Sequence, residues 1–180
     1  MTELRADAQR NLDRVLEAAS DCFAEQGVDV SIDEIARRAG VGHGTVFRRF
    51  PTKDALLSAV VLRRVVELTA VAESALEEPD AGAGFDRFFR TAVELYARNR
   101  ELVEGFGRCI ETDEVAAMED AVARLVRRAQ RAGALRRDVT PLDVMELIPA
   151  ANRHPDVILD GLRSAVRARA QASVTSVTVP

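Results

Sequence analysis

Apolar residues recur at spacings of three and four along most of the chain, a pattern typical of amphipathic helices. The first such stretch predicts a helix over residues 8–26 that ends at Gly27. Pro51 then breaks the chain, and Thr52 is placed to cap a long helix over 53–78. A loop is predicted after it at Pro79-Asp80-Ala81-Gly82. Further helices are predicted over 85–98, 100–111, 114–132 and 155–170, and another begins at Thr140-Pro141 and must end or kink at Pro149. No segment has a convincing strand pattern, so the predicted fold class is all-α.

Between the first two long helices, residues 31–57 predict two short helices joined by a tight turn. Ser31 and Glu34 match an S-x-x-E capping box, in which each side chain binds backbone N–H groups at the helix start. Gly40 closes this helix, because glycine accepts the left-handed backbone that a helix end often needs. A second helix is expected over 43–50. Such a pair is the arrangement of a helix-turn-helix, whose second helix enters the major groove of DNA.

Length and composition allow one helical domain of ordinary size, or a small domain together with a larger one. The chain has 180 residues, of which 47% are hydrophobic, so it can bury a substantial core. Cys22 and Cys109 stand alone and form no metal or redox motif, and each is expected to be a small buried apolar residue. The N-terminus has no apolar signal core, and no run approaches the roughly 18 apolar residues of a membrane span. A cytoplasmic protein without membrane contact is therefore expected.

Positive charge is concentrated in the predicted helix pair, although the net charge is −4. The residues from Ile35 to Lys53 include no acid, whereas the preceding helix carries several. The charge thus gathers on the region that would face DNA. A solvated charge cluster without a partner is the alternative interpretation. The positive residues are Arg37, Arg38, Arg48, Arg49 and Lys53.

Residues 14–57 resemble the tetracycline-repressor (TetR) family of bacterial transcription regulators. The match includes Ile35-Ala36, Ala39-Gly40-Val41, Gly44-Thr45-Val46-Phe47-Arg48-Arg49-Phe50 and Lys53-Asp54-Ala55-Leu56, in order and at fixed spacing. The resemblance implies three N-terminal helices that bind DNA and a C-terminal helical bundle that dimerises and often holds a small ligand. We therefore expect a DNA-binding domain at residues 1–52, a ligand-binding and dimerisation domain at 53–170, and a frayed tail at 171–180.

The positions of the match imply particular DNA contacts. His43, Gly44 and Phe47 fall where family members touch base edges or sugars. Thr45, Arg49 and Lys53 fall where members hold phosphates, Arg48 is a further candidate anchor, and Ser31 can reach a phosphate besides capping its helix.

Two positions depart from the family pattern. Phe47 replaces the usual tyrosine and lacks its hydroxyl, although its ring can meet a thymine methyl group. Asp33 stands where some members place a base-reading arginine. Asp33 is expected either to support the helix N-terminus electrostatically or to accept a hydrogen bond from cytosine N4.

Aromatic and polar residues of the C-terminal part are candidates for lining a ligand pocket, with core packing as the alternative for the aromatic ones. The candidates are Phe88, Phe89, Tyr96, Phe106, Cys109 and Thr112. His154 lacks partners at metal-ligand spacing and is expected to be a capping or surface residue. No metal, cofactor or catalytic residue is predicted, because no metal cluster, phosphate loop or nucleophile–base set is present.

These features predict a homodimeric DNA-binding transcriptional regulator. Its partners would be a palindromic double-stranded DNA operator and a small-molecule effector that releases the protein, acting as a repressor, from that operator. The alternative is a helical ligand-binding or protein-interaction module without DNA binding, against which the intact positive cluster speaks. An enzyme is a further alternative that no motif supports.

Overall fold

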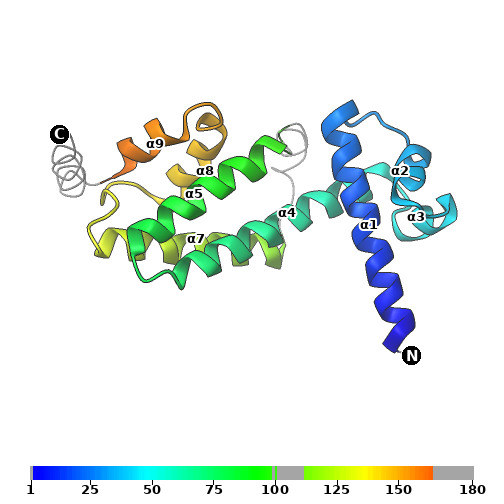
Figure 1. The fold of residues 1–180 in the computed structure, drawn as a ribbon, viewed down its shortest axis with the longest axis horizontal. Coiled ribbons are helices and arrows are strands. Elements are labelled where there is room, and N and C mark those ends of the chain that lie inside the picture. The colour runs from blue at the N-terminus through cyan, green and yellow to red at the C-terminus, as the bar shows by residue number, and fades with distance from the viewer. Residues whose placement is uncertain (1, 99, 101–111, 164–180) are drawn as a thin grey trace, which may run out of the picture. The chain divides into compact units, whose positions relative to one another are not determined.

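The computed structural model describes residues 2–98, 100 and 112–163, and these form eight α-helices (Figure 1). The helices are α1 (Thr2–Gln26), α2 (Ile32–Ala39), α3 (His43–Arg49), α4 (Lys53–Leu76), α5 (Ala81–Arg98), α7 (Asp113–Arg131), α8 (Pro141–Ala150) and α9 (Pro155–Leu162). The described ranges contain no strand, only an isolated bridge between Leu135 and Arg163. The predicted all-α class is therefore confirmed.

The described residues group into two compact units, and α4 contributes to both. The first unit holds residues 2–65 together with 98, 100 and 112, and the second holds residues 66–97 and 113–163. The predicted domain boundaries at residues 52 and 170 stay predictions. The helix predicted over 100–111 lies outside the described residues except at Arg100, and so does the tail at 171–180.

The first unit is built around one apolar cluster to which α1, α2, α3 and the start of α4 contribute. Phe23 of α1, Ile35 of α2 and Leu56 of α4 are fully buried in it. Burial of a side chain of this size stabilises the fold by about 1.5–3 kcal/mol. The short helix α3 contributes only Val46, and Phe50 follows at its end, so the other side chains of α3 face away from the core.

Glycine and serine set the ends of α1 and α2 as the sequence predicts. Gly27 and Gly40 adopt positive φ values of 78° and 65° just after their helices. Ser31 Oγ accepts the backbone N–H of Glu34 at 3.2 Å. The predicted capping box is wrong in its other half, because the Glu34 carboxylate turns to Arg37, which donates through Nε at 3.0 Å. The nearby guanidinium attracts the carboxylate more strongly than a neutral N–H does.

The second unit packs α5, α7, α8 and α9 with the later part of α4 around a separate cluster (Figure 1). Phe88, Phe89, Leu125 and Leu159 are fully buried in this cluster. Helices α4 and α5 approach so closely that a Cβ atom on Gly84 would lie 2.4 Å from the carbonyl oxygen of Ala75. A glycine at this position is therefore a packing requirement.

Polar side chains complete the helix ends of the second unit. Thr140 and Asp143 form a full capping box at the start of α8, and the helix ends at Ala150, directly after Pro149. The hydrogen bonds from Thr140 lower the pKa of Asp143. Arg87 and Arg128 donate to backbone carbonyls of residues 74, 78 and 79, at the end of α4 and just beyond it.

Three helix boundaries differ from the prediction. Helix α1 begins at Thr2, earlier than the predicted residue 8. Helix α5 begins at Ala81, inside the predicted loop, because Asp80 Oδ1 accepts the backbone N–H groups of Gly82 and Ala83 at 2.7 and 3.0 Å. Helix α9 ends at Leu162 and not near residue 170, because Arg163 is extended and pairs with Leu135.

Candidate nucleic-acid interface

The tight turn between α2 and α3 leaves one face of α3 open. Gly40 reverses the chain, and Gly42 starts α3 without a side-chain cap. Val46 anchors the helix with 1% of its surface exposed, while Phe47 on the outer face is 52% exposed. The ring of Phe47 therefore offers apolar surface to any partner that meets this face of α3.

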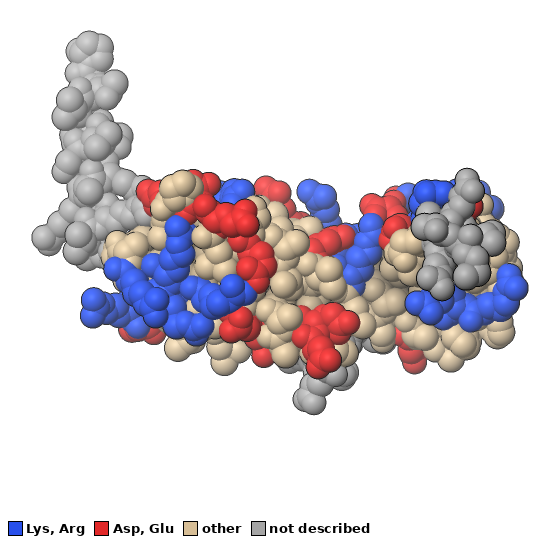
Figure 2. Space-filling view, turned by 90° about the horizontal axis from the view of Figure 1, so that it is seen from below, with Lys and Arg blue, Asp and Glu red and all other residues tan. Residues whose placement is uncertain are grey.

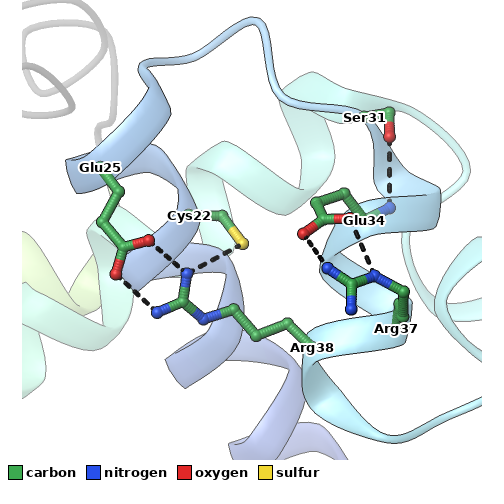
Figure 3. A network of polar contacts seen from close by, with 6 residues as sticks. All are labelled: Cys22, Glu25, Ser31, Glu34, Arg37 and Arg38. Atoms are coloured by element: carbon green, nitrogen blue, oxygen red, sulfur yellow. Dashed lines mark hydrogen bonds and ion pairs between the residues drawn. The ribbon is translucent and has the colours of Figure 1, made fainter.

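Two of the five predicted positive residues are neutralised within the protein (Figure 3). Arg38 makes a bidentate ion pair with Glu25 of α1, with distances of 2.5 and 2.6 Å. Arg37 binds Glu34 one turn earlier on α2. These hydrogen bonds lower the pKa of Glu25 and that of Glu34. Arg37 and Arg38 therefore contribute little net positive charge to an external partner.

The other three positive residues keep their charge uncompensated. Within the described ranges, no carboxylate lies at ion-pair distance from Arg48, Arg49 or Lys53. Arg48 Nε donates to the carbonyl of Gly44 at 3.0 Å, which leaves the guanidinium charge unbalanced. All three residues belong to α3 or to the first turn of α4. The uncompensated positive charge is thus confined to three of the five residues, on α3 and at the start of α4.

The protein surface carries acidic as well as basic side chains, so no overall positive charge marks a binding face. In Figure 2, basic side chains form separate patches on the face in view, with acidic side chains beside and between them. The net charge of −4 agrees with this picture. Attraction to an anionic partner must therefore come from local groups without acidic neighbours.

His43, the first residue of α3, makes two contacts that hold its ring. Its Nδ1 lies 2.5 Å from Oδ1 of Asp33 in the first turn of α2. Its ring stacks on Phe47 with centroids 6.0 Å apart and planes inclined by 14°. Gly44 lies between them in the sequence, and a Cβ atom built there meets nothing within 4 Å. His43, Gly44 and Phe47 thus share one exposed surface.

Thr45 and Arg49 lie on a neighbouring part of α3. They line a surface hollow of about 550 Å³ together with Phe50 and residues of α1, including Asn11 and Leu12. Lys53 opens α4, whose first turn is capped by the Thr52 hydroxyl accepting the N–H of Ala55 at 3.1 Å. Ser31 is engaged as the cap of α2. The DNA-contact roles of all eight candidate residues stay predictions.

The structure describes four of the six candidate pocket residues, namely Phe88, Phe89, Tyr96 and Thr112. Phe88 and Phe89 are fully buried in the core of the second unit, as the core-packing alternative expects. Phe106 and Cys109 lie outside the described residues. Tyr96 packs partly buried against the second unit's core, whereas Thr112 groups with the first unit. Their assignment to a ligand pocket stays a prediction.

The described residues offer no other chemistry of note. They contain no group of three or more His, Cys, Asp or Glu residues that suits a metal ion. None of the helices that the structure describes combines the length and apolar character that a membrane crossing needs. Burial raises the pKa of the Cys22 thiol, which keeps this residue in the apolar role predicted for it.

Several contacts of this region cannot be predicted from the sequence, because they join residues far apart in the chain. Arg63 of α4 donates to the carbonyl of Asp13 at 2.9 Å and to Glu17 at 2.8 Å, which ties α4 to α1. Arg64 likewise reaches Ser20 Oγ at 2.7 Å. Helical periodicity identifies the faces of these helices but not which polar residues meet across them.

Comparison with known proteins gives matches along both parts of the chain. Residues 15–60 match the model of the bacterial regulatory proteins of the tetR family. Residues 80–176 match the model of the C-terminal domain of SbtR-like transcriptional regulators. These are families of transcriptional regulators, a class without enzymatic activity.

Individual relatives agree with these matches. A helix-turn-helix transcriptional repressor of Mycobacterium tuberculosis is 38% identical over 93 residues, which cover 51% of this chain and 46% of the repressor. This chain thus spans about half the length of the curated relatives it matches first. The transcriptional regulator UidR of Escherichia coli is 26% identical over 153 residues, 77% of this chain and 76% of UidR.

Solved structures show the same fold over nearly the whole chain. The crystal structure of a TetR transcription regulatory protein from Mycobacterium vanbaalenii matches with a TM-score of 0.73 and 42% identity, covering 89% of this chain and 99% of that one. A γ-butyrolactone receptor described as ArpA-like matches with a TM-score of 0.68 but only 16% identity, over 94% of this chain and 96% of that one. The second likeness concerns the fold alone.

Proposed function

The chain belongs to the tetR family of bacterial transcriptional regulators, and on this premise we propose that it is a homodimeric repressor that a small-molecule effector releases from its operator. One observation carries the proposal. Arg48, Arg49 and Lys53 have no ion-pair partner among the described residues, and they lie on α3 or at the start of α4, while α3 also carries the exposed surface formed by His43, Gly44 and Phe47. The cations suit the phosphate backbone of DNA, and the exposed surface of α3 suits the base edges in the adjacent groove.

The proposed division of labour follows from side-chain chemistry. Arg48, Arg49 and Lys53 neutralise DNA phosphates. The hydroxyl groups of Thr45 and Ser31 add uncharged hydrogen bonds to the DNA backbone. His43 and Phe47 enter the major groove, where the ring of Phe47 can cover a thymine methyl group. Gly44 lets the backbone of α3 approach the DNA closely, because nothing else occupies the space that a side chain would take.

Dimerisation is supported by apolar side chains that the described residues leave exposed on the last two helices. Leu142 of α8 is 66% exposed and Val157 of α9 is 68% exposed. Burying these residues between two copies would remove apolar surface from water. Two recognition helices related by a two-fold axis would then bind a palindromic operator, and a single helix buries too little surface for strong specific binding.

The effector is proposed to bind the C-terminal part of the chain, for which Phe88, Phe89, Tyr96, Phe106, Cys109 and Thr112 remain the candidate residues. Release requires that the effector bind the DNA-incompetent form more tightly than the DNA-bound form, because equal affinity for both shifts nothing. The repressor role is supported by the M. tuberculosis relative, which is described as a repressor.

Binding of the purified full-length protein to duplex DNA tests the proposal. The probes are the DNA flanking its own gene and a pool of random duplexes, each at 50 mM and 200 mM salt. We expect a selected palindromic sequence whose affinity falls steeply with salt. A protein that retains no duplex at 50 mM salt would refute DNA binding and leave the helical module without DNA binding as the better interpretation.

A further inference from the structure

The side chain of His43 is held by a carboxylate from the neighbouring helix. Asp33 Oδ1 lies 2.5 Å from Nδ1 of His43, a distance that requires a proton between the two atoms. Both side chains are open to solvent, with 77% of Asp33 and 54% of His43 exposed. An exposed pair of this kind adds little to folding stability, so stability alone gives no reason for it.

A second contact fixes the plane of the same ring. His43 and Phe47 stack one helical turn apart, nearly parallel, with centroids separated by 6.0 Å. Asp33 therefore holds one edge of the imidazole and Phe47 restrains its face. The ring nitrogen with no protein partner assigned to it in the described structure is Nε2.

The contact with Asp33 determines what Nε2 can do. A carboxylate only accepts hydrogen bonds, so the proton in this contact is carried by Nδ1. A neutral imidazole has one N–H donor and one acceptor nitrogen, which leaves Nε2 as the acceptor. In the major groove the hydrogen-bond donors are the amino groups N6 of adenine and N4 of cytosine.

We propose that Asp33 is a specificity-determining positioning residue: it fixes the tautomer of His43 so that Nε2 selects an adenine or a cytosine in each half of the operator. The inference rests on the proposed function, since it names the base class that the same surface reads. Asp33 touches no base itself. This role differs from both roles expected from the sequence, which were support of the α2 N-terminus and direct contact with cytosine.

The position of Phe47 predicts a second base close to the one that His43 selects. Successive base pairs rise by about 3.4 Å, so two rings 6.0 Å apart span at most two base-pair steps. Phe47 can then meet a thymine methyl group within two steps of the amino-bearing base. The expected half-site therefore combines an amino-bearing base with a thymine close to it.

The tautomer can be measured directly in the full-length protein without DNA. The chain contains two histidines, so the ¹⁵N–¹H long-range spectrum of histidine-labelled protein is assigned by comparison with His43→Ala. At pH 8 we expect the proton of His43 on Nδ1. A proton on Nε2 would overturn the inference while leaving DNA binding by the protein intact.

Base preference is measured by selection from random duplexes at pH 8, followed by substitution in the selected site. Removing the exocyclic amino group of the selected base in one half-site should weaken wild-type binding roughly fivefold, the effect of one lost hydrogen bond. Replacing a purine N7 by carbon should leave the affinity unchanged. The reverse pattern would show that Nε2 donates, and would overturn the inference.

Variants separate positioning from charge. Asp33→Ala should abolish the amino-group preference at this position alone, and should change nothing further when His43 is already alanine. Glu34→Ala is the matched control, because it removes one negative charge from the same turn of α2 without touching His43. A base preference that survives Asp33→Ala would overturn the inference only. A wild-type protein that selects no sequence would overturn the proposed function, and the inference with it.

Discussion

Replacing Arg49 by alanine removes a cation that has no acidic partner among the described residues and so tests whether α3 binds phosphate. Each phosphate contact adds about 0.9 to the slope of log affinity against log salt concentration. A dimer loses the contact at both half-sites, so the slope should become shallower by about 1.8. Over a rise from about 50 to 200 mM salt, the affinity ratio of wild type to variant should then fall by roughly 12-fold.

Fluorescence anisotropy of a labelled operator duplex across this salt range measures both slopes. Arg37→Ala is the control, since Arg37 is already paired with Glu34 and should leave the slope unchanged. A slope that becomes shallower by only about 0.9 for Arg49→Ala would indicate that one protomer of the dimer contacts the DNA. Equal slopes for wild type and Arg49→Ala would refute phosphate binding by Arg49. Equal changes of slope for Arg49→Ala and Arg37→Ala would refute the claim that Glu34 neutralises Arg37.

Three further predictions concern packing, assembly and acid stability. Gly84→Ala should lower the free energy of unfolding by about 1–3 kcal/mol in denaturant titrations, since its Cβ would lie 2.4 Å from a backbone oxygen. Gly161→Ala, with open space around it, should raise the same quantity by about 0.5–1 kcal/mol. Leu142→Asp should convert dimer to monomer in sedimentation velocity; a persisting dimer would place residue 142 outside the interface. Glu25 has a lowered pKa because a guanidinium donates to it, so its stabilising effect is present above about pH 4.5 and is lost as the pH falls further. The melting-temperature difference between wild type and Glu25→Gln should accordingly shrink below that pH.

Local signals predicted most of the fold. Gly40, Thr52 and the Thr140-Pro141 pair each set a helix end through contacts within four residues, which a sequence displays directly. Apolar spacing identified the buried faces for the same reason, because it depends only on helical geometry. The start of α5 differs from the prediction because the Pro-Asp-Ala-Gly stretch is typical of a loop, whereas Asp80 caps the helix here.

The candidate interface was predicted in its location but not in its electrostatics. The sequence places five positive residues near the helix pair, yet Arg38 is paired with Glu25, thirteen residues away on another helix. The contact between His43 and Asp33 spans ten residues across a turn. Neither pairing follows from periodicity, because both depend on how two helices cross. The packing of the helices therefore determines which arginine side chains lack an ion-pair partner within the protein and can bind DNA.

The small share that α3 takes in the core has a consequence for how such a regulator diverges. Among the described core residues, Val46 and the adjoining Phe50 join this helix to the interior, and the side chains toward the proposed DNA surface lie outside the apolar core. Mutations at 43, 44, 47 and 48 can therefore retarget the protein to a different promoter at little thermodynamic expense, as long as those two anchors stay apolar.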